Sequence, residues 1–74
     1  MSRLPAVKGD AVVEALKHTG FKVLRINGSH HVMGNDDGLR TVVPVHKGKD
    51  LKRGLLRKII DDAGLTVEEF IALL

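Results

Sequence analysis

The dipeptide Asn27-Gly28 is the feature that most restricts the fold, because it stands between two short segments that suit β-strands. Residues 21–26 (FKVLRI) are apolar and β-branched, and residues 29–33 (SHHVM) follow the dipeptide directly. Asn-Gly is the strongest short-range signal for a type I′ hairpin, in which both central residues have positive φ. We therefore expect two antiparallel strands joined by a tight turn at Asn27-Gly28.

A third strand is expected over residues 39–45, after a polar turn at residues 34–38. Pro44 cannot donate a ladder hydrogen bond, so this strand should lie at an edge of the sheet. Apolar residues at helical spacing predict a helix over residues 10–19, capped by Asp10, and another over residues 51–63, capped by Asp50. Thr66 begins a capping-box pattern for a short final helix that runs to residue 74.

These elements predict a single domain over residues 1–74, a length that suits one domain. The fold class is α+β, with element order α-β-β-β-α and a short extra C-terminal helix. Each helix has one apolar face, so the helices are expected to cover one face of a three-stranded antiparallel sheet. The other face of the sheet is expected to remain open to water.

Composition excludes several classes of protein. The chain has no cysteine, which rules out disulfides and thiolate metal sites and fits a cytoplasmic location. Its first residues lack the long apolar run of a signal peptide or membrane span. The two aromatic residues, Phe21 and Phe70, are too few for base stacking of the kind used by RRM and OB-fold domains.

The charge is distributed unevenly along the chain. All 12 Lys and Arg lie in residues 1–60 with five of the nine acids, which gives that part +7, and the other four acids give residues 61–74 a charge of −4. A basic body of this size suggests a polyanionic partner such as a nucleic acid. Ordinary solubility charge is the alternative explanation.

His30 and His31 follow the predicted turn, where a hairpin holds a side chain more firmly than a loop does. Adjacent strand residues point to opposite faces, so the two imidazoles are not expected to bind one metal ion, and no metal-ligand motif accompanies them. An imidazole can accept and return a proton near neutral pH. Periodicity does not decide which histidine faces the helices. His46, at the end of the third strand, is a candidate second proton carrier.

Cations gather at the predicted start of the second helix, where the helix dipole disfavours them. Gly54 in the first turns of that helix also lowers helix propensity by roughly 1 kcal/mol relative to Ala. Both features make sense if a phosphate docks there on backbone N–H groups and on the cations Lys47, Lys49, Lys52 and Arg53. The alternative is that these side chains extend into water.

Three segments in this order and spacing, Gly28-Ser29-His30, residues 43–46 (VPVH) and residues 54–59 (GLLRKI), give a resemblance over residues 9–74. The chain resembles the HicA-type toxins, small mRNA interferases of HicA/HicB toxin–antitoxin systems. The resemblance implies a fold like that of a double-stranded-RNA-binding domain. It also implies RNA cleavage that depends on His30, and a HicB-type antitoxin that binds and blocks the toxin. We expect the free toxin to be monomeric and to enter a hetero-oligomer with the antitoxin.

The leading hypothesis is therefore a metal-independent endoribonuclease toxin without a cofactor that cleaves mRNA. His30 would transfer a proton, and Ser29 and Gly28 would support its position. Phosphate contacts are expected from Arg25, Lys47, Lys49, Lys52 and Arg53. A non-catalytic RNA-binding module of the same fold is the alternative function. A third possibility is an interaction module whose basic surface receives an acidic protein.

Overall fold

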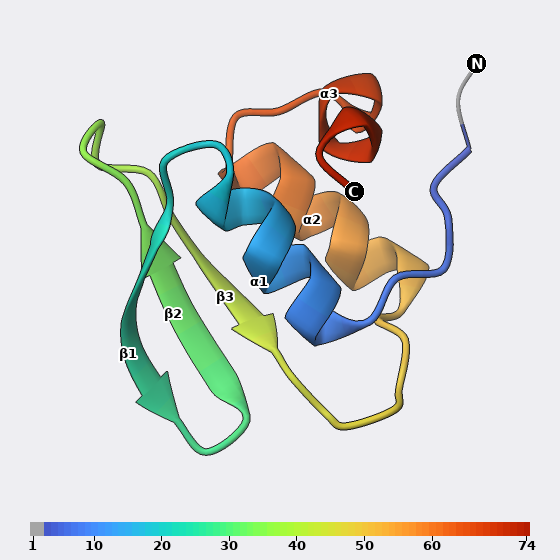
Figure 1. Ribbon diagram of the computed structural model, residues 1–74, viewed down its shortest axis with the longest axis horizontal. Helices are drawn as coiled ribbons and strands as arrows, with labels where there is room; N and C mark the ends of the chain where they lie inside the picture. Colours follow the sequence, from blue (N-terminus) through green and yellow to red (C-terminus); the bar gives the residue numbers. More distant parts are fainter. Residues whose placement is uncertain (1–2) are drawn as a thin grey trace.

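The computed structural model describes residues 3–74, so the first two residues of the predicted 1–74 domain lie outside the described part. Three helices and three strands follow the predicted order (Figure 1). Their bounds are α1 (Gly9–Lys17), β1 (Lys22–Asn27), β2 (His30–Gly34), β3 (Arg40–Pro44), α2 (Arg53–Asp62) and α3 (Val67–Ala72).

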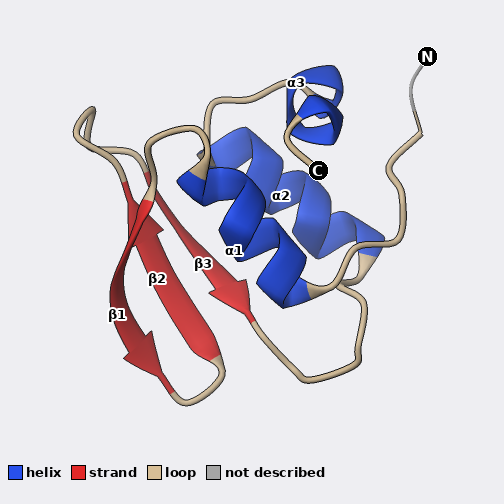
Figure 2. Cartoon of the chain, in the orientation of Figure 1, coloured by secondary structure: helices blue, strands red, loops and turns tan. Residues whose placement is uncertain are grey.

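The strands form one antiparallel sheet in the order β1-β2-β3, so β2 is central and β3 is an edge strand. The helices lie on one side of this sheet, and the other face carries no helix (Figures 1 and 2). The predicted α+β fold with one covered sheet face is therefore confirmed. No helix in residues 3–74 is long and apolar enough to cross a membrane.

The turn between β1 and β2 differs from the prediction by one residue. Asn27 pairs with His30, so the two-residue loop is Gly28-Ser29. Gly28 has a φ of 61°, whereas no non-glycine residue of the described chain has positive φ. This is the pattern of a type II′ turn, which needs glycine at its first central position only. The prediction of a type I′ turn at Asn27-Gly28 was wrong because Asn27 continues the strand pairing.

The pairing of β2 with β3 determines where the β3 backbone points. Asn35 N–H donates to the Leu39 carbonyl at 3.1 Å, and Val45 N–H donates to the Ser29 carbonyl at 2.7 Å. Hydrogen-bonded and non-hydrogen-bonded pairs alternate in an antiparallel ladder, so the even-numbered β3 residues turn their backbone groups to the free edge. Pro44 is one of them, so its missing N–H costs the ladder nothing. Its predicted edge position is confirmed.

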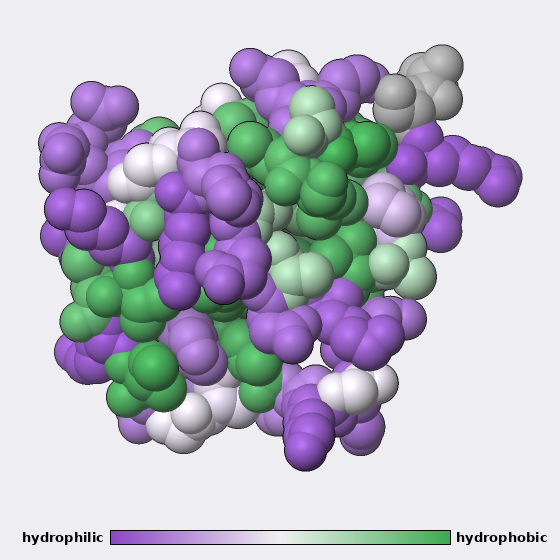
Figure 3. Space-filling view, viewed as in Figure 1, coloured by the Kyte–Doolittle hydropathy of each residue, from purple (hydrophilic) through white to green (hydrophobic). Residues whose placement is uncertain are grey.

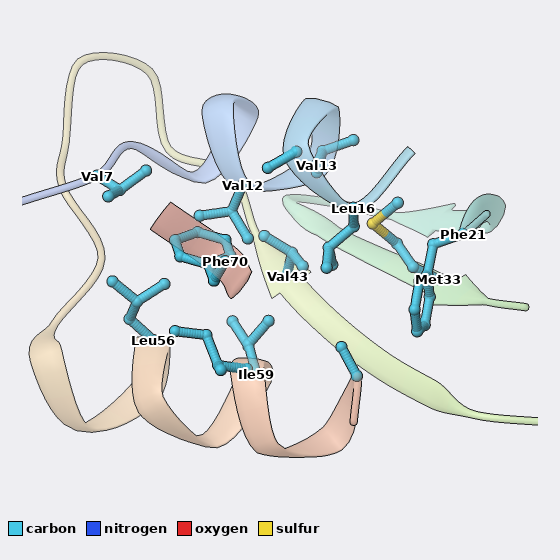
Figure 4. Close-up of a cluster of buried hydrophobic side chains, with 13 residues drawn as sticks. Val7, Val12, Val13, Leu16, Phe21, Met33, Val43, Leu56, Ile59 and Phe70 are labelled. Carbon is cyan, nitrogen blue, oxygen red and sulfur yellow. The ribbon is translucent and has the colours of Figure 1, made fainter. Parts of the chain in front are cut away.

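The hydrophobic core lies between the sheet and the three helices (Figure 4). Met33 and Val43 contribute from the covered face of the sheet, and Phe70 fills the space from α3; all three are fully buried. Helices α1 and α2 complete the core with buried side chains, mainly those of Val12, Val13, Leu16, Leu56, Ile59 and Ile60. Burial of Met33 and Val43 identifies the covered face, and so sets the direction of every other side chain in these strands.

The starts of the first two helices also differ from the prediction. α1 begins at Gly9 after Lys8, and the Asp10 carboxylate accepts only from the N–H of Ala11, at 2.8 Å, so Asp10 is a first-turn residue and not the cap. α2 begins at Arg53, and Asp50 does not cap it. Asp50 instead forms a β-bridge with Lys8 and lies 3.7 Å from the Lys8 ammonium. The chain before α2 is thus tied to the chain before α1, which delays the helix start.

The predicted capping box of the final helix is confirmed. The Thr66 hydroxyl accepts from the Glu69 N–H at 3.0 Å, and the Glu69 carboxylate accepts from the Thr66 N–H at 2.8 Å. The helix ends at Ala72, two residues earlier than predicted. The cap fixes the angle at which Phe70 enters the core.

Two glycines give opposite predictions for substitution by alanine. A Cβ on Gly9 would overlap the Pro44 carbonyl oxygen and lie 3.0 Å from the Val45 Cα, and both are backbone atoms. A Cβ on Gly54 would meet no atom within 4 Å. Gly9→Ala should therefore lower the free energy of unfolding by about 1–3 kcal/mol, and Gly54→Ala should raise it by up to about 1 kcal/mol. Urea denaturation followed by circular dichroism measures both; equal midpoints for the two variants would contradict the packing described at Gly9.

Candidate active site

The two adjacent histidines lie on opposite faces of the sheet. His31 is opposite Val43 and shares the covered face with Met33. Its side chain is half-buried, and its Nδ1 lies 3.3 Å from the Ser29 carbonyl oxygen. His30 is opposite Pro44 and is exposed on the open face. Strand periodicity did not decide which histidine faces the helices; in the structure His31 faces them, and His30, the histidine that the resemblance implies, is on the open face, where it is exposed to ligands.

A hollow of about 440 Å³ lies beside His30, within the roughly 300–1,000 Å³ range of ligand pockets. Its lining comes from the open face of β2 and β3 and from the neighbouring side of α2. The lining residues are His30, Val32, Arg40, Thr41, Val42, Pro44, Leu55, Lys58, Ile59 and Asp62. Because these residues belong to both faces of β3, the hollow runs from the open sheet face, around the free edge of β3, to α2.

A hydrogen-bonded group closes one side of the hollow. The Asp62 carboxylate accepts from the Thr41 hydroxyl at 3.1 Å and from the Lys58 ammonium at 2.9 Å. Thr41 is buried, so its hydroxyl would be left without a partner if Asp62 were removed. Asp62 therefore ties the end of α2 to β3, and its charge is balanced by Lys58. Lys58 and Asp62 are engaged with each other, whereas the side chain of His30 makes no hydrogen bond within residues 3–74.

Two cations of the hollow, Arg40 and Lys58, were missed by the sequence analysis. Arg40 is opposite Gly34 and lies four residues before Pro44 on the same strand. Residues an even number apart share a face, so Arg40 is on the open face with His30. A signal for Arg40 was present, because pairing the strands across the turn at residues 34–38 gives this register. Lys58 comes from the exposed side of α2, and its place beside β3 depends on how the helix packs, which no local pattern shows.

The predicted phosphate contacts are divided between two places. Arg25 is opposite Val32, so it lies on the open face as a diagonal neighbour of His30. The other four cations are exposed in the loop after β3 and at the start of α2, and do not line the hollow; they are Lys47, Lys49, Lys52 and Arg53. Figure 1 shows the start of α2 on the opposite side of the molecule from the hairpin that carries His30.

The start of α2 keeps the unusual features that the sequence indicated. Its first turn has no acidic residue, and its N-cap, Lys52, makes no side-chain capping bond. Gly54 has open space beside it and is not among the glycines with positive φ, so neither packing nor backbone conformation requires it.

The remaining predicted site residues have supporting or separate positions. Gly28 and Ser29 form the turn that precedes His30, and the Ser29 carbonyl joins this turn to Val45, the residue directly after β3. His46 lies in the exposed loop after β3, where its carbonyl accepts from Lys49 N–H at 3.0 Å, and its side chain does not line the hollow. Within residues 3–74 no group of three or more His, Asp or Glu side chains is placed to hold a metal ion.

The arrangement suits acid–base chemistry on an anionic substrate. An exposed imidazole can transfer a proton, and guanidinium and ammonium groups nearby can stabilise negative charge as it develops. The apolar walls of the hollow strengthen such interactions by excluding part of the water.

Comparison with known proteins identifies the family. None of the curated proteins matches the chain. A family model described as the HicA toxin of bacterial toxin–antitoxin systems matches residues 9–65 of the 74, a segment that runs from the start of α1 to just beyond α2 and includes every residue of the hollow. The chain therefore belongs to the HicA toxin family of bacterial toxin–antitoxin systems.

Proposed function

We propose that this toxin is a metal-independent endoribonuclease that cleaves mRNA in the cytoplasm and that His30 is its catalytic residue. The observation that carries the proposal is the position of His30: it is exposed on the open sheet face and lines a hollow with two cations. Family membership supports the toxin role, and a cognate antitoxin, of the HicB type by resemblance, would bind and inhibit the protein.

The chemistry follows from the substrate. RNA carries its own nucleophile, the 2′-hydroxyl, next to each phosphate. Cleavage requires that this hydroxyl lose a proton, that the charge on the phosphate be offset, and that the leaving 5′-oxygen gain a proton. His30 can act as the base or as the acid of this reaction, and one such positioned group contributes about 10²–10⁴-fold in rate.

The cations divide into two roles. Arg40 and Lys58 line the same hollow as His30, and Arg25 is its diagonal neighbour on the open face; these three cations would hold the RNA at the site of cleavage. The more distant cluster of Lys47, Lys49, Lys52 and Arg53 would bind phosphates elsewhere along the RNA, with help from the amide groups at the start of α2. Contacts of the first kind stabilise the transition state, whereas contacts of the second kind mainly raise affinity.

Substitution of His30 tests the catalytic assignment. His30→Ala should lower the rate of cleavage of purified RNA in EDTA by about 10²–10⁴-fold, because the proton-transfer group is lost. It should also abolish growth arrest when the toxin is induced. Cleavage is followed by gel electrophoresis of an end-labelled RNA.

His18→Ala is the matched control, because His18 is exposed at the end of α1 and outside the hollow. It should cleave at the wild-type rate. If His30→Ala also cleaves at that rate, His30 is not catalytic. If the wild-type chain binds RNA but leaves it uncut at stoichiometric concentration, the protein is the non-catalytic RNA-binding module instead.

Neutralising the two kinds of cation tests their roles. Arg40→Gln should lower the cleavage rate at saturating RNA by about 10-fold or more, because a charge beside the reacting phosphate is lost. The double variant Lys47→Gln/Lys49→Gln should weaken binding and reduce the salt slope, by about 0.7 for each lost contact to single-stranded RNA, with the saturated rate nearly unchanged. Lys17→Gln, on α1 in an exposed ion pair with Glu14, is the control. The division is wrong if Arg40→Gln changes affinity alone.

A further inference from the structure

The free edge of β3 carries backbone groups that the described chain does not use. The odd-numbered residues of β3 turn their N–H and C=O groups toward β2, so Arg40 and Val42 turn theirs away from the sheet. Neither of these two amides donates a hydrogen bond within residues 3–74, and the Val42 residue is 43% exposed. A regular, uncovered edge of this kind is a template for one more strand.

Other parts of the sheet edges are protected against such pairing. Pro44 has no N–H, and its carbonyl oxygen lies close against Gly9 at the start of α1. On the opposite edge, the register of β1 is irregular between Val23 and Arg25, which breaks the even spacing of its backbone groups. Hydrophobic surface appears over β1 in Figure 3. Leu24 and Ile26 of this strand are exposed, but they lie along the irregular edge.

The hollow beside the β3 edge fits the side chains of an added strand. Successive residues of a strand point to opposite faces, so alternate side chains of a strand paired with β3 would point toward the hollow. Its walls include the apolar residues Val32, Val42, Pro44, Leu55 and Ile59, and it has no aromatic side chain on which a base could stack. Lys58 is paired with Asp62 at 2.9 Å, so the net positive charge of the hollow's polar border comes from Arg40.

We infer that the antitoxin binds by adding an extended segment to the free edge of β3. Its apolar side chains enter the hollow, and an acidic side chain lies near Arg40 and Lys58. A protein strand supplies both the donors and the acceptors that the outward C=O and N–H groups of Arg40 and Val42 require. RNA has donors in its 2′-hydroxyls and bases, but it does not present donors and acceptors in alternation at the spacing of a strand, so the antitoxin is the better occupant.

This docking mode explains how the partner inhibits the toxin, in a way that rests on the proposed function of His30. Because His30 lines the same hollow, a segment that fills the hollow covers the imidazole and excludes RNA from it. The docking itself depends only on the strand edge and the shape and charge of the hollow.

Amide hydrogen exchange measured by NMR tests the docking without relying on catalysis. The co-expressed complex of the toxin with its antitoxin is compared with the free toxin, released from the complex in denaturant and refolded. We expect the Arg40 and Val42 amides to exchange at least about 100-fold more slowly in the complex, because each gains a carbonyl acceptor.

A pair of variants at one position gives a second readout. Val42→Pro removes the outward N–H but no hydrogen bond to β2, whereas Val42→Thr keeps the N–H and the branched shape. We expect the Kd for the antitoxin to rise about 10-fold or more for Val42→Pro and to stay within about threefold for Val42→Thr. Thermal unfolding shows whether the free variants fold; if Val42→Pro does not, the exchange rates of the wild-type chain decide.

The outcomes separate this inference from the proposed function. Unchanged exchange at Arg40 and Val42 in the saturated complex would overturn the docking mode, even if His30→Ala has lost cleavage. Protection of both amides would support it, even if His30→Ala still cleaves RNA. If an RNA oligonucleotide alone protects the same amides, RNA binds at the β3 edge and the inference is wrong.

Discussion

Burial of Met33 and Val43 against the helices is the constraint on which the rest of the structure depends. Side chains alternate strictly along a strand, so placing these two residues in the core assigns a face to every residue of β2 and β3. His31 is drawn toward the helices, and His30 is directed to the open face. A slip of one residue would bury His30 and expose Met33, and the cost of exposing Met33 opposes it. The core thus positions the candidate catalytic group without touching it.

The element order, the three-stranded sheet, the edge position of Pro44 and the capping box at Thr66 were all predictable, because each depends on a local pattern. The errors occurred where a tertiary contact competes with a local one. Asp50 suits a helix cap, but pairing with Lys8 holds it outside α2. Asn27 suits a turn, but the ladder of β1 and β2 includes it and moves the turn to Gly28-Ser29.

The site was predictable only in part, for a related reason. Strand periodicity did not distinguish His30 from His31, since Val32 and Met33 are both apolar and either could face the core; only the resemblance selected His30. Once the buried face is known, strand parity and register give His30, Arg25 and Arg40 a common face. Lys58 could not be found in this way, because its position depends on the packing of α2 across β3. Charge density in the sequence instead drew attention to residues 47–53. These residues form a cluster along the chain, but none of them lines the hollow beside His30.

The small size of the domain explains why its candidate functional groups lie on the uncovered parts of the sheet. A chain of 74 residues buries a smaller fraction of its surface than a larger domain does, and here the helices suffice for one face of one short sheet. The second face and the β3 edge are therefore left to solvent, and the polar and apolar groups there are the ones that can contact other molecules. Since His30 and the β3 edge border the same hollow, a ligand at one of them necessarily affects access to the other. The proposed catalysis and its proposed inhibition can then share one surface, with no need for a conformational change to connect them.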